Sequence, residues 1–168
     1  MEHGRSLDSG AAYGACQGPM GLITSADMER AWRCRKVVLP QHTDHAGVLW
    51  HGAYVAWLEE ARVEALAQAG LAYADLAATG LELMVTDLQV RYRQALVHGE
   101  RVDLLSRLLP SRGVRQPFQT LFLRADGALA AEAMVTLVLV DRARGRALRR
   151  PPAALAAALE RLTDGPCL

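Results

Sequence analysis

Hydrophobic residues recur along the chain with two different periods, and the change of period separates a helical half from a stranded half. Residues 52–69 carry apolar side chains at three- and four-residue steps, which predicts one long helix with an apolar stripe. The stripe consists of Tyr54, Trp57, Leu58, Ala61 and Ala65. Gly70 stands where a glycine commonly ends a helix. A shorter helix is expected at residues 72–79.

From about residue 84 the period is two, which predicts strands. In the first strand, Met84, Leu88, Val90 and Tyr92 are expected on the face opposite Asp87, Gln89, Arg91 and Arg93. Further strands are expected at 101–109, 118–124 and 129–140, with Asp126-Gly127 as a hairpin turn. Before the long helix, a short strand is expected from Trp32 to Leu39, ended by Pro40, and a short terminal helix at 153–162.

This order of elements predicts an α+β fold, in which a curved antiparallel sheet wraps around a long central helix. The expected domain covers residues 31–152. It follows a flexible N-terminal extension, 1–30, and precedes a short C-terminal helix and tail, 153–168. Only one face of the sheet is covered by the helix, which favours an oligomer.

Composition narrows the class of protein. The chain has 168 residues, 51% of them hydrophobic and 22% charged, which is typical of one globular domain. The net charge of +1 argues against a nucleic-acid binder driven by charge. No apolar run approaches the roughly 18 residues of a membrane span, and the N-terminus lacks a secretory signal, so a cytoplasmic location is expected. Cys16, Cys34 and Cys167 form no disulfide framework or zinc motif.

The densest candidate chemistry lies in QHTDHAGVLWHGAYVAWLEEAR, residues 41–62. Its side chains allow three interpretations: a metal site, a catalytic loop leading into a helix, or a polar loop without chemistry. His42, Asp44, His45 and His51 are suitable metal ligands. No H-x-x-x-H pair and no distant Cys/His cluster completes a site, so no metal is expected. Taken alone, Asp44 is better explained as a turn or capping aspartate than as a catalytic group.

The same stretch resembles the loop and helix of the 4-hydroxybenzoyl-CoA thioesterase family, acyl-CoA thioesterases of the hotdog fold. The matching positions are Asp44, Gly47, Val48, Trp50, His51, Tyr54, Trp57, Glu60 and Ala61. The expected element order matches over residues 33–152. The resemblance implies a hotdog fold and hydrolysis of an acyl- or aryl-CoA thioester. The acyl group would be of the 4-hydroxybenzoyl or 1,4-dihydroxy-2-naphthoyl type, or of short or medium chain length.

The resemblance also implies roles for individual residues. Asp44 is expected to be the catalytic carboxylate, either as nucleophile or as general base. The backbone amide of His51, at the electropositive start of the helix, is expected to polarise the thioester carbonyl, and its imidazole is a candidate to orient water or substrate. Gly52 has no side chain, so a ligand can approach the backbone there.

Substrate contacts are predicted for a larger set: Gly47, Val48, Trp50, Gly52, Tyr54, Trp57, Glu60, Arg112 and Arg115. Tyr54, Trp57, Met84 and Leu88 are candidates to line the acyl pocket. Arg112 and Arg115, or else Arg149 and Arg150, can meet the coenzyme A phosphates. No cofactor is expected, because coenzyme A is part of the substrate. The resemblance implies a homodimer or homotetramer, with sites at the subunit boundary.

Other functions fit the same pattern. His45 and Gln41 depart from the commoner family pattern, which leaves the acyl group open. A hydratase or dehydratase uses the same fold. A non-catalytic module that binds acyl thioesters or an acyl carrier protein would need the cleft but not Asp44. A purely structural oligomerising domain would need neither.

Overall fold

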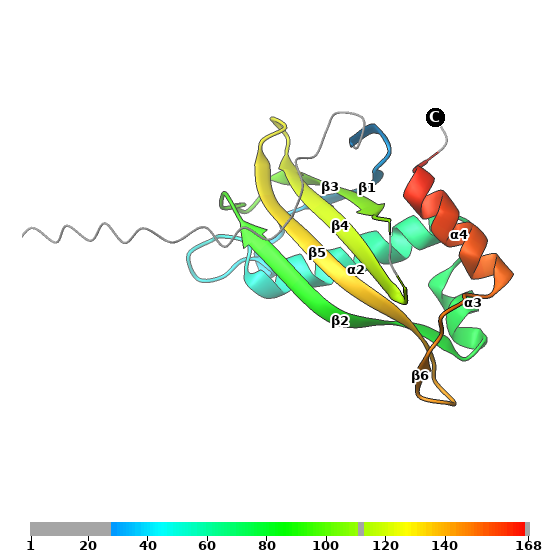
Figure 1. The fold of residues 1–168 in the computed structure, drawn as a ribbon. Helices are drawn as coiled ribbons and strands as arrows, with labels where there is room; N and C mark the ends of the chain where they lie inside the picture. Colours follow the sequence, from blue (N-terminus) through cyan, green and yellow to red (C-terminus); the bar gives the residue numbers. More distant parts are fainter. Residues whose placement is uncertain (1–27, 111–112, 167–168) are drawn as a thin grey trace, which may run out of the picture.

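The computed structural model describes residues 28–110 and 113–166, and its elements follow the predicted order (Figure 1). They are β1 (Trp32–Val37), a 3-10 turn η1 (Pro40–His42), α2 (His51–Gln68), α3 (Tyr73–Ala78), β2 (Leu81–Tyr92), β3 (Arg101–Leu108), β4 (Arg115–Arg124), β5 (Leu129–Asp141), β6 (Arg146–Ala147) and α4 (Ala153–Asp164). Only the short elements η1 and β6 were not expected. Residues 1–27 of the predicted extension, together with Cys16, Arg112 and Cys167, lie outside the described residues.

The topology explains why the long helix lies against the sheet. The strands are ordered β1-β3-β4-β5-β2, with β6 paired to β5, and each pairing is antiparallel. Because β1 and β2 form the two edges, the chain between them must cross the whole sheet. That crossing contains α2, which lies against one face, called the inner face below (Figure 1). The predicted curved sheet around a central helix is confirmed.

The core lies between α2 and the inner face. Trp57 is 2% exposed and Tyr54 is 3% exposed. The Tyr54 ring contacts Tyr92 of β2 and Phe122 of β4, with ring centroids 4.9 and 5.1 Å apart. Ala61 and Ala65 bring the helix axis close to the sheet because they carry only a methyl group. The predicted apolar stripe is therefore the face that is buried.

One expectation about β2 is wrong. Its ladder with β5 shifts by one residue between Val85 and Asp87, which is a β-bulge. Leu88 pairs with Val135, which belongs to the core, so Leu88 lies on the inner face. Met84 pairs with Val138, which lies on the opposite face of β5, so Met84 lies on the outer face. Met84 and Leu88 therefore lie on opposite faces of the strand, although strict alternation placed them together.

Helix α4 closes the core at the far end of α2. Its buried residues are Leu155, Ala158 and Leu162. The indole Nε1 of Trp32 donates a hydrogen bond to the carbonyl of Leu162 at 3.2 Å. The Arg161 guanidinium donates to the carbonyl of Ala69, at the C-terminal end of α2, where a cation is favourable. Helix α4 therefore covers the C-terminal end of α2. The loop that contains Asp44 lies at the opposite, N-terminal end.

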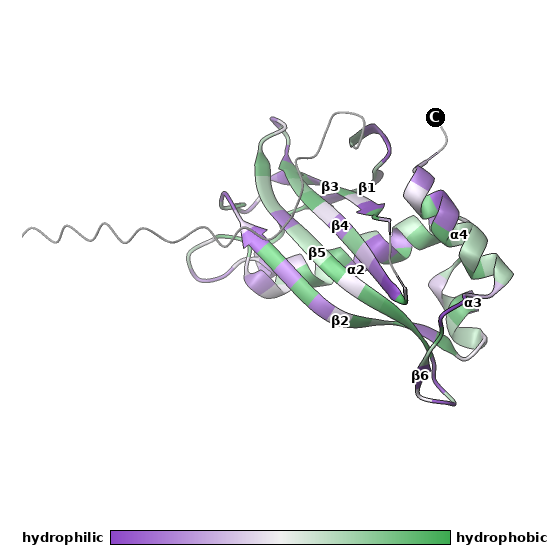
Figure 2. Ribbon diagram, in the orientation of Figure 1, coloured by the Kyte–Doolittle hydropathy of each residue, from purple (hydrophilic) through white to green (hydrophobic). Residues whose placement is uncertain are grey.

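The two edges of the sheet differ in character. On β1, Arg33, Arg35 and Lys36 supply the charges that commonly protect an edge strand. Strand β2 is twice as long, and hydrophobic and hydrophilic residues alternate in its second half, after the bulge (Figure 2). The side chains of Leu88 and Tyr92 are 38% and 54% exposed, although both lie on the inner face.

Candidate active site

The loop before α2 is a short hairpin held in one conformation by backbone bonds. Thr43 bridges to Leu49, and the Asp44 amide donates to the carbonyl of Val48 at 2.9 Å. Gly47 closes the turn with φ of 75°, a conformation that favours glycine, and its amide donates to the Asp44 carbonyl. The Trp50 amide donates to the carbonyl of His42 at 3.0 Å. The hairpin therefore fixes Asp44 relative to the first residue of the helix.

The Asp44 carboxylate is oriented by its own loop. Its Oδ1 accepts hydrogen bonds from the amides of Ala46 at 2.8 Å and Val48 at 3.3 Å. Within the described part of the chain, Oδ2 has no hydrogen-bond partner. The side chain is exposed in the single chain. One oxygen therefore holds the group in place, and the other is open to a substrate or a water molecule.

The start of α2 offers backbone donors. No side chain caps the helix at Trp50, and the first bond of the turn runs from the Ala53 amide to the Trp50 carbonyl at 3.0 Å. The amides of His51 and Gly52 precede that bond and have no acceptor among the described residues. Amides of this kind, with the helix dipole behind them, favour negative charge on a nearby oxygen.

Asp44 and this helix start are close in the hairpin. His42 is bonded opposite Trp50, and Asp44 follows His42 by two residues. At about 3.3 Å per extended residue, the backbone of Asp44 lies on the order of 7 Å along the hairpin from the level of Trp50. A thioester carbonyl can lie across such a gap. This arrangement of a carboxylate and helix amides suits acyl transfer.

Trp50 and Gly52 lie at the start of α2, on either side of His51 in the sequence. The Trp50 side chain is 43% exposed, and its ring lies edge-on to the exposed His51 ring, with centroids 5.1 Å apart. A Cβ atom at Gly52 would overlap the six-membered ring of Trp50, whose Cζ2 lies 2.5 Å from that position. The absence of a side chain at Gly52 is thus what allows the indole to lie over the first turn.

Several predicted site residues lie elsewhere. Tyr54 and Trp57 are buried in the core, so their contact with substrate stays a prediction. Burial, with Tyr92 and Glu100 nearby, raises the pKa of Tyr54 to about 12, so its hydroxyl stays protonated. Glu60 forms an ion pair with Lys36 of β1. Arg115 starts β4 at the end of the sheet opposite the Asp44 loop.

The loop histidines have separate surroundings. His42 Nδ1 accepts a hydrogen bond from the Leu39 amide at 3.2 Å, and its ring contacts Trp57 edge-on at 5.2 Å. These contacts make His42 a support for the hairpin. His45 is exposed at the turn. Across residues 28–110 and 113–166, His, Cys, Asp and Glu side chains form no group of three suited to a metal ion.

The sequence did not predict a role for the loop at residues 94–100, which contacts the Asp44 hairpin through its backbone. Leu96 is fully buried, and its carbonyl accepts from the Leu49 amide at 2.7 Å. Val97 bridges to Val48. Glu100 accepts from the Val97 amide at 3.0 Å and forms an ion pair with Arg124. The only sequence signal was a short apolar run, Ala-Leu-Val, too short to show a period.

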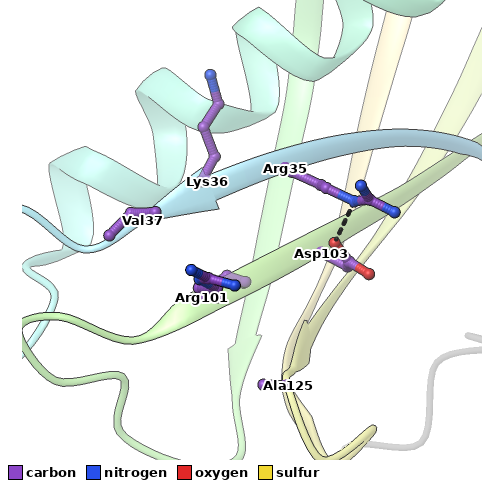
Figure 3. Close-up of a pocket in the computed structure, with 7 residues that line it drawn as sticks. Arg35, Lys36, Val37, Arg101, Asp103 and Ala125 are labelled. Carbon is purple, nitrogen blue, oxygen red and sulfur yellow. Dashed lines mark ion pairs between the residues drawn. The ribbon is translucent and has the colours of Figure 1, made fainter.

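The larger cavity described lies away from these groups. It has a volume of about 440 Å³ and is bounded by β1, β3 and the turn after β4 (Figure 3). Arg35 pairs with Asp103 beside it, and the Lys36 side chain points toward α2 (Figure 3). A smaller cavity lies between α2, α4 and the sheet, next to Arg62. Neither of these two cavities is lined by Asp44 or His51.

Comparison with known proteins decides the family. The profile of the Thioesterase-like superfamily matches residues 38–159, from the end of β1 into α4. The chain belongs to the Thioesterase-like superfamily. It is accordingly a thioester hydrolase, and the expected hotdog fold is confirmed. No helix in the described ranges has the length and apolar character needed to cross a bilayer.

Relatives in this superfamily cover most of the same region. A Synechocystis sp. protein with a provisional esterase name is 38% identical over 116 residues, 68% of this chain and 70% of its own. The acyl-CoA thioester hydrolase YbgC of Escherichia coli is 29% identical over 101 residues, 60% of this chain and 75% of its own. A DHNA-CoA thioesterase from Staphylococcus aureus superposes with a TM-score of 0.66 and 26% identity, covering 70% of this chain and 78% of its own.

Proposed function

We propose that this thioester hydrolase acts on an acyl-coenzyme A and releases the free acid and coenzyme A. In this proposal Asp44 is the catalytic carboxylate and the His51 amide is the donor to the carbonyl oxygen. The observation that carries it is the Asp44 side chain, held through Oδ1 on a hairpin that leads directly into an uncapped helix start. The names of the E. coli and S. aureus relatives support a coenzyme A thioester.

Two routes fit the site, and both need an ionised carboxylate. In the first, an Asp44 oxygen bonds to the carbonyl carbon, the C–S bond breaks, and water then hydrolyses the mixed anhydride. In the second, Asp44 takes a proton from a water molecule, whose oxygen attacks the same carbon before the C–S bond breaks. In each route negative charge develops on the carbonyl oxygen. The amides at the start of α2 stabilise that charge.

The function is tested with a panel of thioesters. We expect free thiol to be released from at least one of 4-hydroxybenzoyl-CoA, 1,4-dihydroxy-2-naphthoyl-CoA, a short-chain acyl-CoA and a medium-chain acyl-CoA. The ratio of kcat/KM values assigns the acyl group. Release of thiol from none of the four substrates would overturn the proposal.

We further propose that the active unit is a homodimer formed through β2. This strand is an edge of 12 residues, and its outward backbone groups pair with none of the strands described in the single chain. Val85 of β2 is 49% exposed, as expected of an apolar side chain that a partner covers. Antiparallel pairing of two β2 strands would extend the sheet and bury apolar side chains along this edge.

Such a dimer also completes the site. The two-fold operation reverses the strand direction, so it brings the far end of one sheet toward the Asp44 end of the other. Arg115 of one chain lies at the end of its own sheet away from Asp44, so in this proposal the partner's Arg115 is the candidate for contact with the coenzyme A phosphates.

Two valine variants test the dimer. Val85 on β2 and Val37 on β1 are similarly exposed, at 49% and 43%, but lie on opposite edges. We expect Val85→Lys to lower the mass measured by sedimentation equilibrium from dimer to monomer, and Val37→Lys to leave it unchanged. A dimer that survives Val85→Lys but not Val37→Lys would place the interface on the other edge.

A further inference from the structure

Trp50 has an unusual position for a large aromatic residue. Of the three tryptophans, Trp32 and Trp57 are 7% and 2% exposed, whereas Trp50 is 43% exposed. The Trp50 amide donates to the His42 carbonyl, and its own carbonyl accepts from Ala53. The backbone of Trp50 is therefore fixed, and only its side-chain torsion angles can vary. The indole lies over the first turn of α2.

The fold-back depends on Gly52. The ring occupies the space that a Cβ atom at this position would need. The indole thus covers backbone next to the two unbonded amides of the helix start. An apolar ring in this place excludes water from one side of those donors, and a donor that is shielded from water stabilises charge more strongly.

We propose that Trp50 is a positioning residue for the thioester. Its indole lies over Gly52 beside the His51 amide, and there it would limit the directions from which the carbonyl can reach that amide. The inference rests on the proposed function, because it presumes that a thioester binds at this helix start. It adds a residue that orients the reacting group without taking part in proton transfer or attack.

The expected signature is a loss in kcat rather than in KM. The coenzyme A part of such a substrate extends well beyond the thioester carbonyl, so we expect removal of the indole to change binding little. Misplacing the carbonyl by about 1 Å can cost on the order of 100-fold in rate. We expect Trp50→Ala to lower kcat by about 10- to 100-fold with KM within about 3-fold, and Trp50→Phe to retain most of the rate.

Gly52→Ala provides an independent perturbation, since it displaces the ring without changing it. Alanine is also a better helix former than glycine, so the helix is not weakened. We expect Gly52→Ala to reproduce much of the loss in kcat in the wild-type background. In the Trp50→Ala background the same change should cost less than about 3-fold, because both changes act through the same indole. Equal losses in both backgrounds would show that Gly52 acts without Trp50 and would overturn the inference.

Fluorescence gives a readout that does not depend on turnover. Because Trp50 is the exposed tryptophan of the three, acrylamide quenching reports mainly on it. We expect a non-hydrolysable thioether analogue of the best acyl-CoA to protect wild-type fluorescence from acrylamide, and to have no such effect in Trp50→Phe. If no thioester is hydrolysed by the wild type, the proposed function fails. If the wild type is active while Trp50→Ala keeps its kcat and the analogue gives no protection, the inference about Trp50 fails.

Discussion

Leu96 offers a direct test of how the fold supports the Asp44 hairpin. Its side chain is fully buried, and its carbonyl holds the Leu49 amide just before α2 begins. Leu→Ala at fully buried sites costs about 2.7–5.0 kcal/mol, as transfer free energy plus the free energy of the cavity left behind. Because Leu96 is fully buried and belongs to the hydrophobic core, we expect about 3–4 kcal/mol for Leu96→Ala. For a chain of this size that corresponds to a fall in Tm of about 10 °C.

The assay is urea unfolding followed by circular dichroism, with Val97→Ala as the matched control. Val97 is the next residue, but it is 44% exposed, so its truncation should cost less than about 1 kcal/mol. We also expect Leu96→Ala to lower kcat below the temperature at which it unfolds, because the hairpin loses its support. A Leu96→Ala protein within 1 kcal/mol of the wild type, or no less stable than Val97→Ala, would refute this account of the loop.

Three further predictions concern groups outside the hairpin. Burial, together with a hydrogen bond to Glu64, raises the pKa of the Cys34 thiol from 9.0 to about 11, so the folded state keeps a proton that the unfolded state loses. The free energy of unfolding should therefore fall as pH rises from about 9 to 11, and Cys34→Ala should reduce that slope in urea titrations. The same burial should keep native Cys34 unreactive toward a thiol reagent at pH 8, with reaction appearing only on unfolding. Glu60→Gln should change stability by less than about 1 kcal/mol and kcat/KM by less than about 3-fold, since Glu60 pairs with Lys36; a larger loss in kcat/KM would favour the predicted substrate contact.

Periodicity was sufficient for the main helices and strands because each buries one face. The stripe of Tyr54, Trp57 and Ala61 is the face that α2 presents to the sheet. Periodicity failed at the β2 bulge, where one extra residue near Thr86 reverses the alternation and sends Met84 to the outer face. Nothing in the residue types around Thr86 marks that position. A two-residue strand such as β6 is likewise too short to show any period.

The candidate site was predictable where it is local in sequence and not where it depends on topology. Asp44, Gly47 and His51 lie within one hairpin and its helix, so their spacing already constrains their geometry. The support from Leu96 comes from a loop about 50 residues away, and only the strand order brings it there. Arg115 illustrates the reverse case, because the direction of β4 takes it away from the hairpin.

The central claim is that the Asp44 carboxylate performs the reaction opposite the start of α2. Its most direct test is the kcat of Asp44→Asn on the best thioester, measured beside Asp126→Asn. Both aspartates accept a backbone amide two residues on through Oδ1, at 2.8 and 3.0 Å, so asparagine preserves both turns and changes only the charge. We predict a loss of at least about 100-fold for Asp44→Asn and no change for Asp126→Asn. Equal activity of the two variants would contradict the account.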